Sequence, residues 1–168
     1  MPATPDDLFQ RLDALGITHE THWHEPVYTV AESQALRGTL TGGHSKNLFL
    51  KNKKGDIWLV TAAEDAAVDL KALTKTLQAG RLSFGKPELL LEVLGVEPGS
   101  VTPFGLINDP DHSVTFVLDE RLAAMDPLNF HPLVNNATTA IGTADFRKFL
   151  EDCGHTVLSV DFPPAEVA

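Results

Sequence analysis

Apolar residues recur at helical spacing in four segments of the chain. These segments are 5–15, 69–78, 87–94 and 145–153. In the first, Leu8, Leu12 and Leu15 share one helix face, and two aspartates precede them, where negative charge suits the start of a helix. A glycine follows each segment within two residues, and glycine commonly ends helices because it adopts the left-handed conformation. The pattern predicts four helices, and a fifth, short helix is expected after Thr29, which forms a capping box with Glu32.

Short runs that alternate in polarity or are rich in β-branched and aromatic residues predict strands. They lie at 21–25, 47–50, 57–61, 82–84, 114–118, 138–141 and 157–160. The polar segment KNKKGD joins the second run to the third and is typical of an antiparallel hairpin loop. Residues 39–45 are expected to form a turn or an exposed loop. Because strands outnumber helices, the sequence predicts one α+β domain over residues 1–168, with a mixed, largely antiparallel, curled (barrel-like) sheet and surrounding helices.

One stretch, PGSVTPFGLIND at 98–109, fits neither pattern. Gly99, Pro103 and Gly105 disfavour a continuous helix or a regular strand, yet Phe104 and its apolar neighbours are too hydrophobic for a free surface loop. A bent segment that its hydrophobic residues hold to a core presents backbone N–H and C=O groups toward a cavity, and glycine lets a ligand approach them closely. The alternative is a well-packed turn between two elements.

The composition is that of an ordinary globular protein: 168 residues, of which 43% are hydrophobic and 21% charged. No apolar run reaches the roughly 20 residues of a membrane-spanning helix, and the N-terminal MPATPDDLFQ lacks the features of a secretory signal. The single cysteine, Cys153, excludes an internal disulfide and a cysteine-rich metal site. These features predict a cytoplasmic location without membrane contact. Cys153 is expected to be an unreactive thiol near the end of an apolar helix.

The net charge of −10 argues against nucleic acid wrapped around the whole surface, because its phosphates would be repelled. The charge is unevenly distributed, however. Residues 46–86 hold eight basic and four acidic side chains, which gives +4, and the remaining chain holds five basic and nineteen acidic ones, which gives −14. A basic segment on an acidic body suits a polyanion that binds locally. A solvated lysine-rich hairpin explains the same pattern.

The signatures of several enzyme classes are absent from the sequence. It has no G-x-S-x-G elbow, P-loop, Rossmann glycine fingerprint or H-E-x-x-H motif. His22 and His24 share one face of a predicted strand, but no carboxylate or third histidine stands at a spacing typical of a metal site. No metal or other cofactor is therefore expected. The remaining candidates for chemistry are Lys46, Asn47, the stretch 98–109 and His131.

Three segments together resemble one family. They are GGHSKNLFLK at 42–51, ELLLEVLGVEPGSVTPFGLIND at 88–109 and FHPLVNNATTAIGT at 130–143. In order and spacing they are similar to the YbaK-like prolyl-tRNA-editing deacylases, and most closely to the freestanding branch that clears alanine from mischarged prolyl tRNA. The resemblance puts the family's lysine at Lys46, its G-x-x-x-P loop at 99–103, and the histidine of the alanine-editing branch at His131.

The resemblance implies roles for three sets of residues. The catalytic set is Lys46, Gly99, Ser100, Val101, Thr102, Pro103 and His131. The substrate contacts are Asn47, Phe104, Gly105, Asn108, Pro132 and Asn136, and the tRNA contacts are Lys51, Lys53 and Lys54. Lys46 is expected to bind the terminal phosphate or ribose as a cation and not to act as a general base, since an exposed amine stays protonated near pH 7.

The implied activity is hydrolysis of the ester of Ala-tRNA(Pro), without a metal or a covalent enzyme intermediate. An aminoacyl ester is already activated, so positioning, a water molecule and stabilisation of the oxyanion suffice. Cognate proline has to be refused by clash, because attraction alone favours the larger side chain by roughly 0.8 kcal/mol per buried CH₂. Two alternatives stay open: a deacylase for another small residue such as serine or cysteine, and a non-catalytic module associated with tRNA or a synthetase. The expected partners are mischarged tRNA and either prolyl-tRNA synthetase or an elongation factor.

Overall fold

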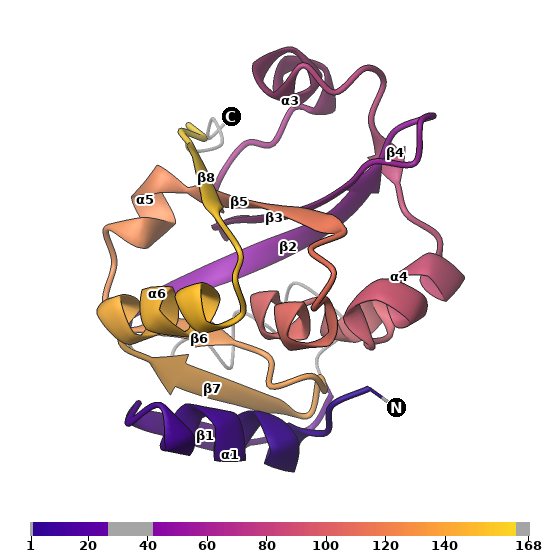
Figure 1. Ribbon diagram of the computed structural model, residues 1–168. Coiled ribbons are helices and arrows are strands. Elements are labelled where there is room, and N and C mark those ends of the chain that lie inside the picture. The colour runs from indigo at the N-terminus through magenta and orange to yellow at the C-terminus, as the bar shows by residue number, and fades with distance from the viewer. Residues whose placement is uncertain (1, 27–41, 164–168) are drawn as a thin grey trace.

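The computed structural model describes residues 2–26 and 42–163, and within them eight strands form one mixed sheet with helices packed around and inside its curl (Figure 1). Seven strands follow the order β1-β7-β6-β2-β3-β5-β8, and β4 pairs with β2 beside this path. The strands are β1 (His19–Trp23), β2 (Gly43–Lys51), β3 (Ile57–Ala63), β4 (Ser83–Phe84), β5 (Val114–Asp119), β6 (Leu128–Phe130), β7 (Ala137–Ile141) and β8 (Val157–Val160). The helices are α1 (Pro5–Ala14), α3 (Leu70–Leu77), α4 (Pro87–Leu94), α5 (Glu120–Ala123) and α6 (Thr143–Asp152), with the 3₁₀ turns η1 (Pro98–Ser100) and η2 (Pro103–Asn108).

Strand β2 connects the two halves of the sheet. On one edge it pairs with β3 in antiparallel fashion over residues 45–51. On the other edge its first two residues, Gly43 and His44, pair in parallel with β6, and its last two, Leu50 and Lys51, pair with β4. Over residues 45–49 no strand of the described part of the chain covers this second edge. Among the described residues, the middle of β2 therefore has no strand partner on this edge.

Aromatic rings hold the curl of the sheet. Phe146 of α6 contacts Phe116 of β5 and Phe130 of β6, with ring centroids 6.2 and 4.8 Å apart, so α6 packs against both halves. Phe104 of η2 is fully buried and lies edge-on to Phe130 and Phe149 at 5.6 and 5.4 Å. Edge-to-face contacts of this kind add to the burial of the rings. The 98–109 stretch is thus anchored in the main core.

Helix ends follow the caps that the sequence offers. Thr4 caps α1 and forms a capping box with Asp7, and the side chain of Asp69 caps α3. Gly95 ends α4 in the left-handed conformation (φ 69°), as predicted. Helix α3 instead ends at Gln78, which is itself left-handed (φ 51°), two residues before the predicted Gly80.

Most predicted elements are confirmed: helices α1, α3, α4 and α6, and every predicted strand. The expected loop over 39–45 is wrong for residues 43–45, because pairing with β6 and β3 extends β2 to Gly43. Helix α5 and strand β6 were not predicted, since four and three residues are too short for a periodic signal. The helix expected after Thr29 lies outside the described residues. No helix in the described ranges is long and apolar enough to span a membrane.

Candidate active site

Two predicted catalytic residues, Lys46 and His131, lie next to the point where the pairing of β2 and β6 ends. The parallel pairing of these strands ends at His44↔Asn129. Lys46 and His131 each lie two residues beyond that pair, Lys46 within β2 and His131 directly after β6. Paired strands are about 4.8 Å apart, so the backbones that lead to the two residues are neighbours at the last pair. Beyond it the strands are no longer paired. We place the candidate active site at this separation.

Lys46 is half-buried and its ammonium group donates a hydrogen bond to the backbone carbonyl of Ala66, in the segment that follows β3. None of the described carboxylates forms an ion pair with it. A carbonyl leaves the positive charge uncompensated, so the ammonium group can exchange this contact for a phosphate oxygen. The geometry fits the expected role of Lys46 as an anchor for an anionic substrate.

Asn47 points to the opposite face of β2, as adjacent strand residues do. Its Oδ1 accepts a hydrogen bond of 2.6 Å from the hydroxyl of the buried Thr61, and its Nδ2 lies 3.4 Å from Oγ of Ser45. Because Thr61 holds the oxygen, the amide N–H₂ is the end that remains for a ligand. Asn47 is thus oriented as a donor.

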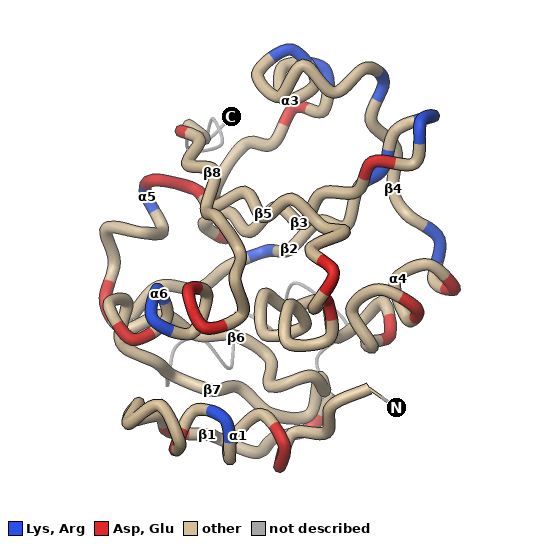
Figure 2. The backbone as a smooth tube through the Cα atoms, in the orientation of Figure 1, with Lys and Arg blue, Asp and Glu red and all other residues tan. Residues whose placement is uncertain are grey.

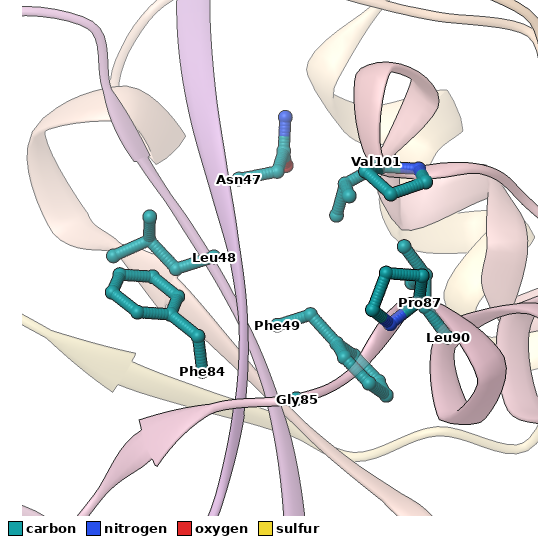
Figure 3. A pocket seen from close by; sticks show the side chains of 9 residues that line it. Asn47, Leu48, Phe49, Phe84, Gly85, Pro87, Leu90 and Val101 are labelled. Atoms are coloured by element: carbon teal, nitrogen blue, oxygen red, sulfur yellow. The ribbon is translucent and has the colours of Figure 1, made fainter.

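A pocket of about 220 Å³ brings Asn47 together with the 98–109 stretch (Figure 3). Pro98 and Val101 line it from this stretch, and Phe49 of β2 and Leu90 of α4 complete its apolar wall. The remaining lining residues are Leu48, Phe84, Gly85 and Pro87. Lys46 is not among the lining residues. Of the two neighbouring candidates on β2, Asn47 is the one that lines this pocket.

The turn at 99–103 carries backbone N–H groups that can bind a ligand. Those of Ser100 and Phe104 are bonded within the stretch, to a carbonyl at 2.8 Å and to Oγ1 of Thr102 at 3.3 Å. For the N–H groups of Gly99, Val101 and Thr102, the described part of the chain provides no hydrogen-bond partner. Thr102 is fully buried, and buried backbone N–H groups are normally paired. These groups are suited to a carbonyl oxygen or an oxyanion of a bound substrate.

His131 is held by its Nδ1, which donates to the carbonyl of Ala137 at 3.0 Å. This bond makes Nε2 the unprotonated nitrogen of the neutral ring, and no described residue bonds to it. Burial lowers the pKa of His131 below its ordinary value, opposed by the bond to Ala137 and assisted by nearby His24. The ring is therefore a neutral acceptor at pH 7, oriented by the backbone.

The predicted residues around His131 differ in exposure. Pro132 is buried and follows His131 directly, which restricts the backbone at the ring. Asn136 is exposed, and its carbonyl accepts from the backbone N–H of His24 at 2.9 Å. Nε2 of His24 lies 2.8 Å from Oγ1 of Thr138. Strand β1 thus supports the segment that carries His131.

Three predicted substrate contacts, Phe104, Gly105 and Asn108, pack within the protein. A side chain at Gly105 would meet Cβ of Leu94 at 3.1 Å, so glycine allows η2 to approach α4 closely. Asn108 donates to the carbonyl of Leu94 and accepts from the backbone N–H of Ala3, both at 2.8 Å. None of the three lines the 220 Å³ pocket. Like the buried Pro103 at the start of η2, they support the loop, and their contact with substrate stays a prediction.

The lysines expected to bind tRNA lie on the β2–β3 hairpin (Figure 2). Lys51 and Lys53 line a second hollow of about 250 Å³ together with Asn52, Arg81 and Ser83. Lys54 is exposed at the hairpin tip. Arg81 lies close to these lysines in space although it is about thirty residues away in sequence, and no sequence motif predicted this proximity.

Two observations concern metal and thiol chemistry. The described residues contain no group of three or more His, Cys, Asp or Glu side chains that could hold a metal. Burial raises the pKa of the Cys153 thiol to about 11, which confirms the expected unreactive cysteine. Sequence reasoning missed Thr61 and the carbonyl of Ala137, which orient Asn47 and His131. Only strand register and the course of the 131–137 turn reveal these partners.

Known proteins resemble this chain in sequence and in fold. A family model described as an aminoacyl-tRNA editing domain matches residues 24–149. The chain is 40% identical over 160 residues to prolyl-tRNA synthetase associated domain-containing protein 1 of Bos taurus, covering 92% of this chain and 93% of that protein. It is 33% identical over 152 residues to prolyl-tRNA editing protein ProX of Acetoanaerobium sticklandii, covering 90% and 93%. A crystal structure described as that of a candidate trans-editing enzyme for prolyl tRNA synthetase shares the fold, with a TM-score of 0.70, 21% identity and coverage of 98% and 100%.

Proposed function

The chain belongs to the aminoacyl-tRNA editing domain family, and we propose that it is a trans-editing hydrolase that removes alanine from mischarged Ala-tRNA(Pro). The observations that carry the proposal are the positions of Lys46 and His131, each two residues beyond the last pair of β2 and β6, and the N–H groups of the 99–103 turn, which have no hydrogen-bond partner among the described residues. A cation, a neutral acceptor and backbone donors are the groups that hydrolysis of an aminoacyl ester requires.

In the proposed reaction Lys46 binds the 3′-terminal phosphate or ribose region of the tRNA. The carbonyl oxygen of the ester lies against the N–H groups of the 99–103 turn, which stabilise the negative charge as a water oxygen bonds to the carbonyl carbon. The bond from that carbon to the ribose oxygen then breaks, and the ribose oxygen takes the proton that the water gives up. A neighbouring ribose hydroxyl can assist the attack. Nε2 of His131 is a neutral acceptor for a proton of the water or of the amino group of the substrate.

Selectivity for alanine follows from the size of the space left for the aminoacyl group. Attraction alone would prefer proline, so the wall has to refuse it. His131, tied to Ala137 and followed by the buried Pro132, is suited to such a wall because its ring has little freedom to move. In this proposal Lys51, Lys53 and Lys54 bind the tRNA backbone. The chain acts as one cytoplasmic domain, and its mischarged tRNA is either released from prolyl-tRNA synthetase or carried by an elongation factor.

Deacylation of a panel of substrates tests the proposal. The purified protein is mixed with Ala-, Ser-, Cys- and Pro-tRNA(Pro), and the charged tRNA that remains is followed over time, with the Lys46→Ala variant as control. Fastest loss of alanine by the wild type supports the proposal. Fastest loss of serine or cysteine replaces the substrate, and binding of tRNA without any hydrolysis identifies a non-catalytic module.

A further inference from the structure

The short strand β4 separates two hollows of different character. Phe84 lines the apolar pocket of about 220 Å³, which reaches Asn47 and Val101 at its other end. Ser83, the other residue of β4, lines the second hollow of about 250 Å³ with Lys51, Lys53 and Arg81. The two hollows therefore adjoin along β4, one apolar and one basic. A chain with flat apolar groups and regularly spaced negative charges matches such a pair.

The apolar pocket runs past the edge of β2 that has no strand partner over residues 45–49 among the described residues. In Figure 3, Phe84 and Leu48 lie on one side of this strand and Phe49, Leu90 and Val101 on the other. The carbonyl of Phe49 points to this edge, where it accepts from the N–H of Gly85 at 2.9 Å. Backbone groups two residues apart on a strand point the same way, so those of Asn47 face the pocket as well. The pocket thus offers polar atoms between apolar walls.

Phe84 is the one exposed large apolar residue of the described chain that stands among basic groups. It is 60% exposed, as is Trp23, while Leu91 is 53% and Leu158 43% exposed. Isolated exposed hydrophobic residues are common, so exposure alone indicates nothing. Leu91, however, is flanked on α4 by Glu88 and Glu92, and Trp23 lies between Glu20 and Glu25 in sequence.

The charges around Phe84 are strongly positive. The basic residues of the hairpin and of the β4 region are Lys51, Lys53, Lys54, Arg81 and Lys86. The acidic ones are Asp56, whose carboxylate already accepts from Asn52 at 3.0 Å, and Glu88 at the start of α4. None of the five basic side chains forms an ion pair with another described residue. Figure 2 shows this concentration of basic residues at the hairpin and β4.

We propose that Phe84 is a stacking platform for an unpaired nucleobase of the tRNA 3′ end, and that the basic hollow with Lys51, Lys53 and Arg81 holds the adjacent phosphates. Single-stranded nucleic acid is bound by this combination, in which aromatic faces take the bases and cations follow the backbone. The pocket continues from Phe84 to the 98–109 stretch, so the platform guides the aminoacylated end toward the candidate active site. The inference rests on the proposed function, because it states how the same substrate is held.

Equilibrium binding of uncharged RNA tests the platform. The probes are a minihelix with the acceptor stem of tRNA(Pro) and its unpaired 3′ nucleotides, and the same minihelix without those nucleotides. Fluorescence anisotropy measures the Kd for wild type, Phe84→Leu and Phe84→Tyr at one salt concentration. Loss of one stacked base is expected to weaken binding of the full probe by about 5- to 150-fold in Phe84→Leu. Phe84→Tyr keeps the aromatic face and should bind like wild type.

The controls separate stacking from charge and from folding. Leu91→Ala removes another exposed apolar side chain, which lies next to acidic residues, and should leave both Kd values unchanged. Phe84→Leu should keep the wild-type salt slope, whereas Arg81→Gln should reduce it by about 0.7, the value for one single-strand phosphate contact. The truncated probe should bind wild type and Phe84→Leu alike. Three results would each overturn the platform. They are equal affinities of wild type and Phe84→Leu for the full probe, a loss of affinity of Phe84→Leu for the truncated probe as large as that for the full probe, and no binding of either probe by wild type at low salt.

The outcome is distinguishable from failure of the proposed function, because uncharged RNA needs no catalysis. Binding that depends on Phe84 without deacylation of any mischarged tRNA would overturn the proposed function and leave the platform standing. Deacylation combined with RNA binding that does not depend on Phe84 would overturn the platform and leave the proposed function standing.

Discussion

Truncation of His131 tests whether proline is refused by a rigid wall. The ring is held at Nδ1 by the carbonyl of Ala137 at 3.0 Å and is followed by the buried Pro132. His131→Ala removes the ring and leaves a space of several heavy atoms beside the candidate active site. If this ring is the wall, the variant should admit larger aminoacyl groups.

The magnitude follows from the size of the two amino acids. The proline side chain has two more carbon atoms than that of alanine, and at about 0.8 kcal/mol per buried CH₂ an open pocket favours proline by about 1.6 kcal/mol, or about 15-fold. In the wild type the clash opposes this attraction. The ratio of proline to alanine turnover should therefore rise by at least about 10-fold in His131→Ala, and turnover of alanine should fall because the small substrate is held less firmly.

Single-turnover deacylation of Ala-, Ser- and Pro-tRNA(Pro) measures this ratio. His131→Asn is the matched variant, since its amide can still donate to the carbonyl of Ala137 while Nε2 and part of the ring are lost. It should show a smaller change in selectivity than His131→Ala. Equal loss of all substrates in both variants would refute the wall and give His131 a catalytic or purely structural role. Unchanged kinetics would remove it from the pocket.

Four further predictions concern the site and the stability of the fold. Lys46→Ala should nearly abolish deacylation with an unchanged circular dichroism spectrum, because it removes the anchor for the substrate and only one hydrogen bond to Ala66; a near wild-type rate would contradict this role. Binding of tRNA should weaken steeply with salt, with a log–log slope of roughly −0.7 to −0.9 for each phosphate contact, and a slope near zero would exclude the Lys51, Lys53 and Lys54 group. Burial lowers the pKa of His131 from its ordinary 6.5, so the unfolded state binds more protons between the two pKa values. The free energy of unfolding should therefore decrease as the pH falls from about 6.5 through the folded-state pKa. Urea unfolding at pH 7.5 and 5.5 should show a smaller decrease in His131→Asn than in wild type. An equal decrease in both proteins would contradict the lowered pKa of His131. Deacylation should survive EDTA, whereas a loss that zinc restores would point to a metal at His22 and His24.

Local patterns predicted the fold because its larger elements carry their own signals. Helix α4 has proline at its start, three successive leucines and a left-handed glycine at its end, and its predicted bounds are those observed. The mixed character of the sheet was expected, but which strands pair in parallel was not. The pairings β2–β6, β3–β5 and β5–β8 are parallel. They join strands far apart in sequence, and no local pattern records that choice.

The candidate site was predictable in its residue types and not in its geometry. Lys46, Asn47 and His131 stand out only through their resemblance to a family, since a lone lysine or histidine carries no pattern. The orientation of Asn47 depends on Thr61, at 2.6 Å, and that of His131 on the carbonyl of Ala137, at 3.0 Å, which strand register and a turn bring into contact with them. Adjacent residues Lys46 and Asn47 point to opposite faces of β2, as strand periodicity requires, and only the structure shows which of them lines the pocket.

The packing of the 98–109 stretch gives the proposed refusal of proline a physical basis. A wall that refuses proline has to resist about 1.6 kcal/mol of attraction, the value for two buried CH₂ groups. Phe104 is fully buried among three aromatic rings, and withdrawing such a side chain from the core costs about 1.5 to 3 kcal/mol. At the end of the stretch, Asn108 uses both ends of its amide within the protein, and the buried Asp109 accepts from two backbone N–H groups and lies 3.0 Å from Nε2 of His155. Withdrawing Phe104 alone costs about as much as proline could gain, and breaking the hydrogen bonds of Asn108 and Asp109 adds to that cost. The stiffness that the proposed selectivity requires therefore comes from side chains that touch the core.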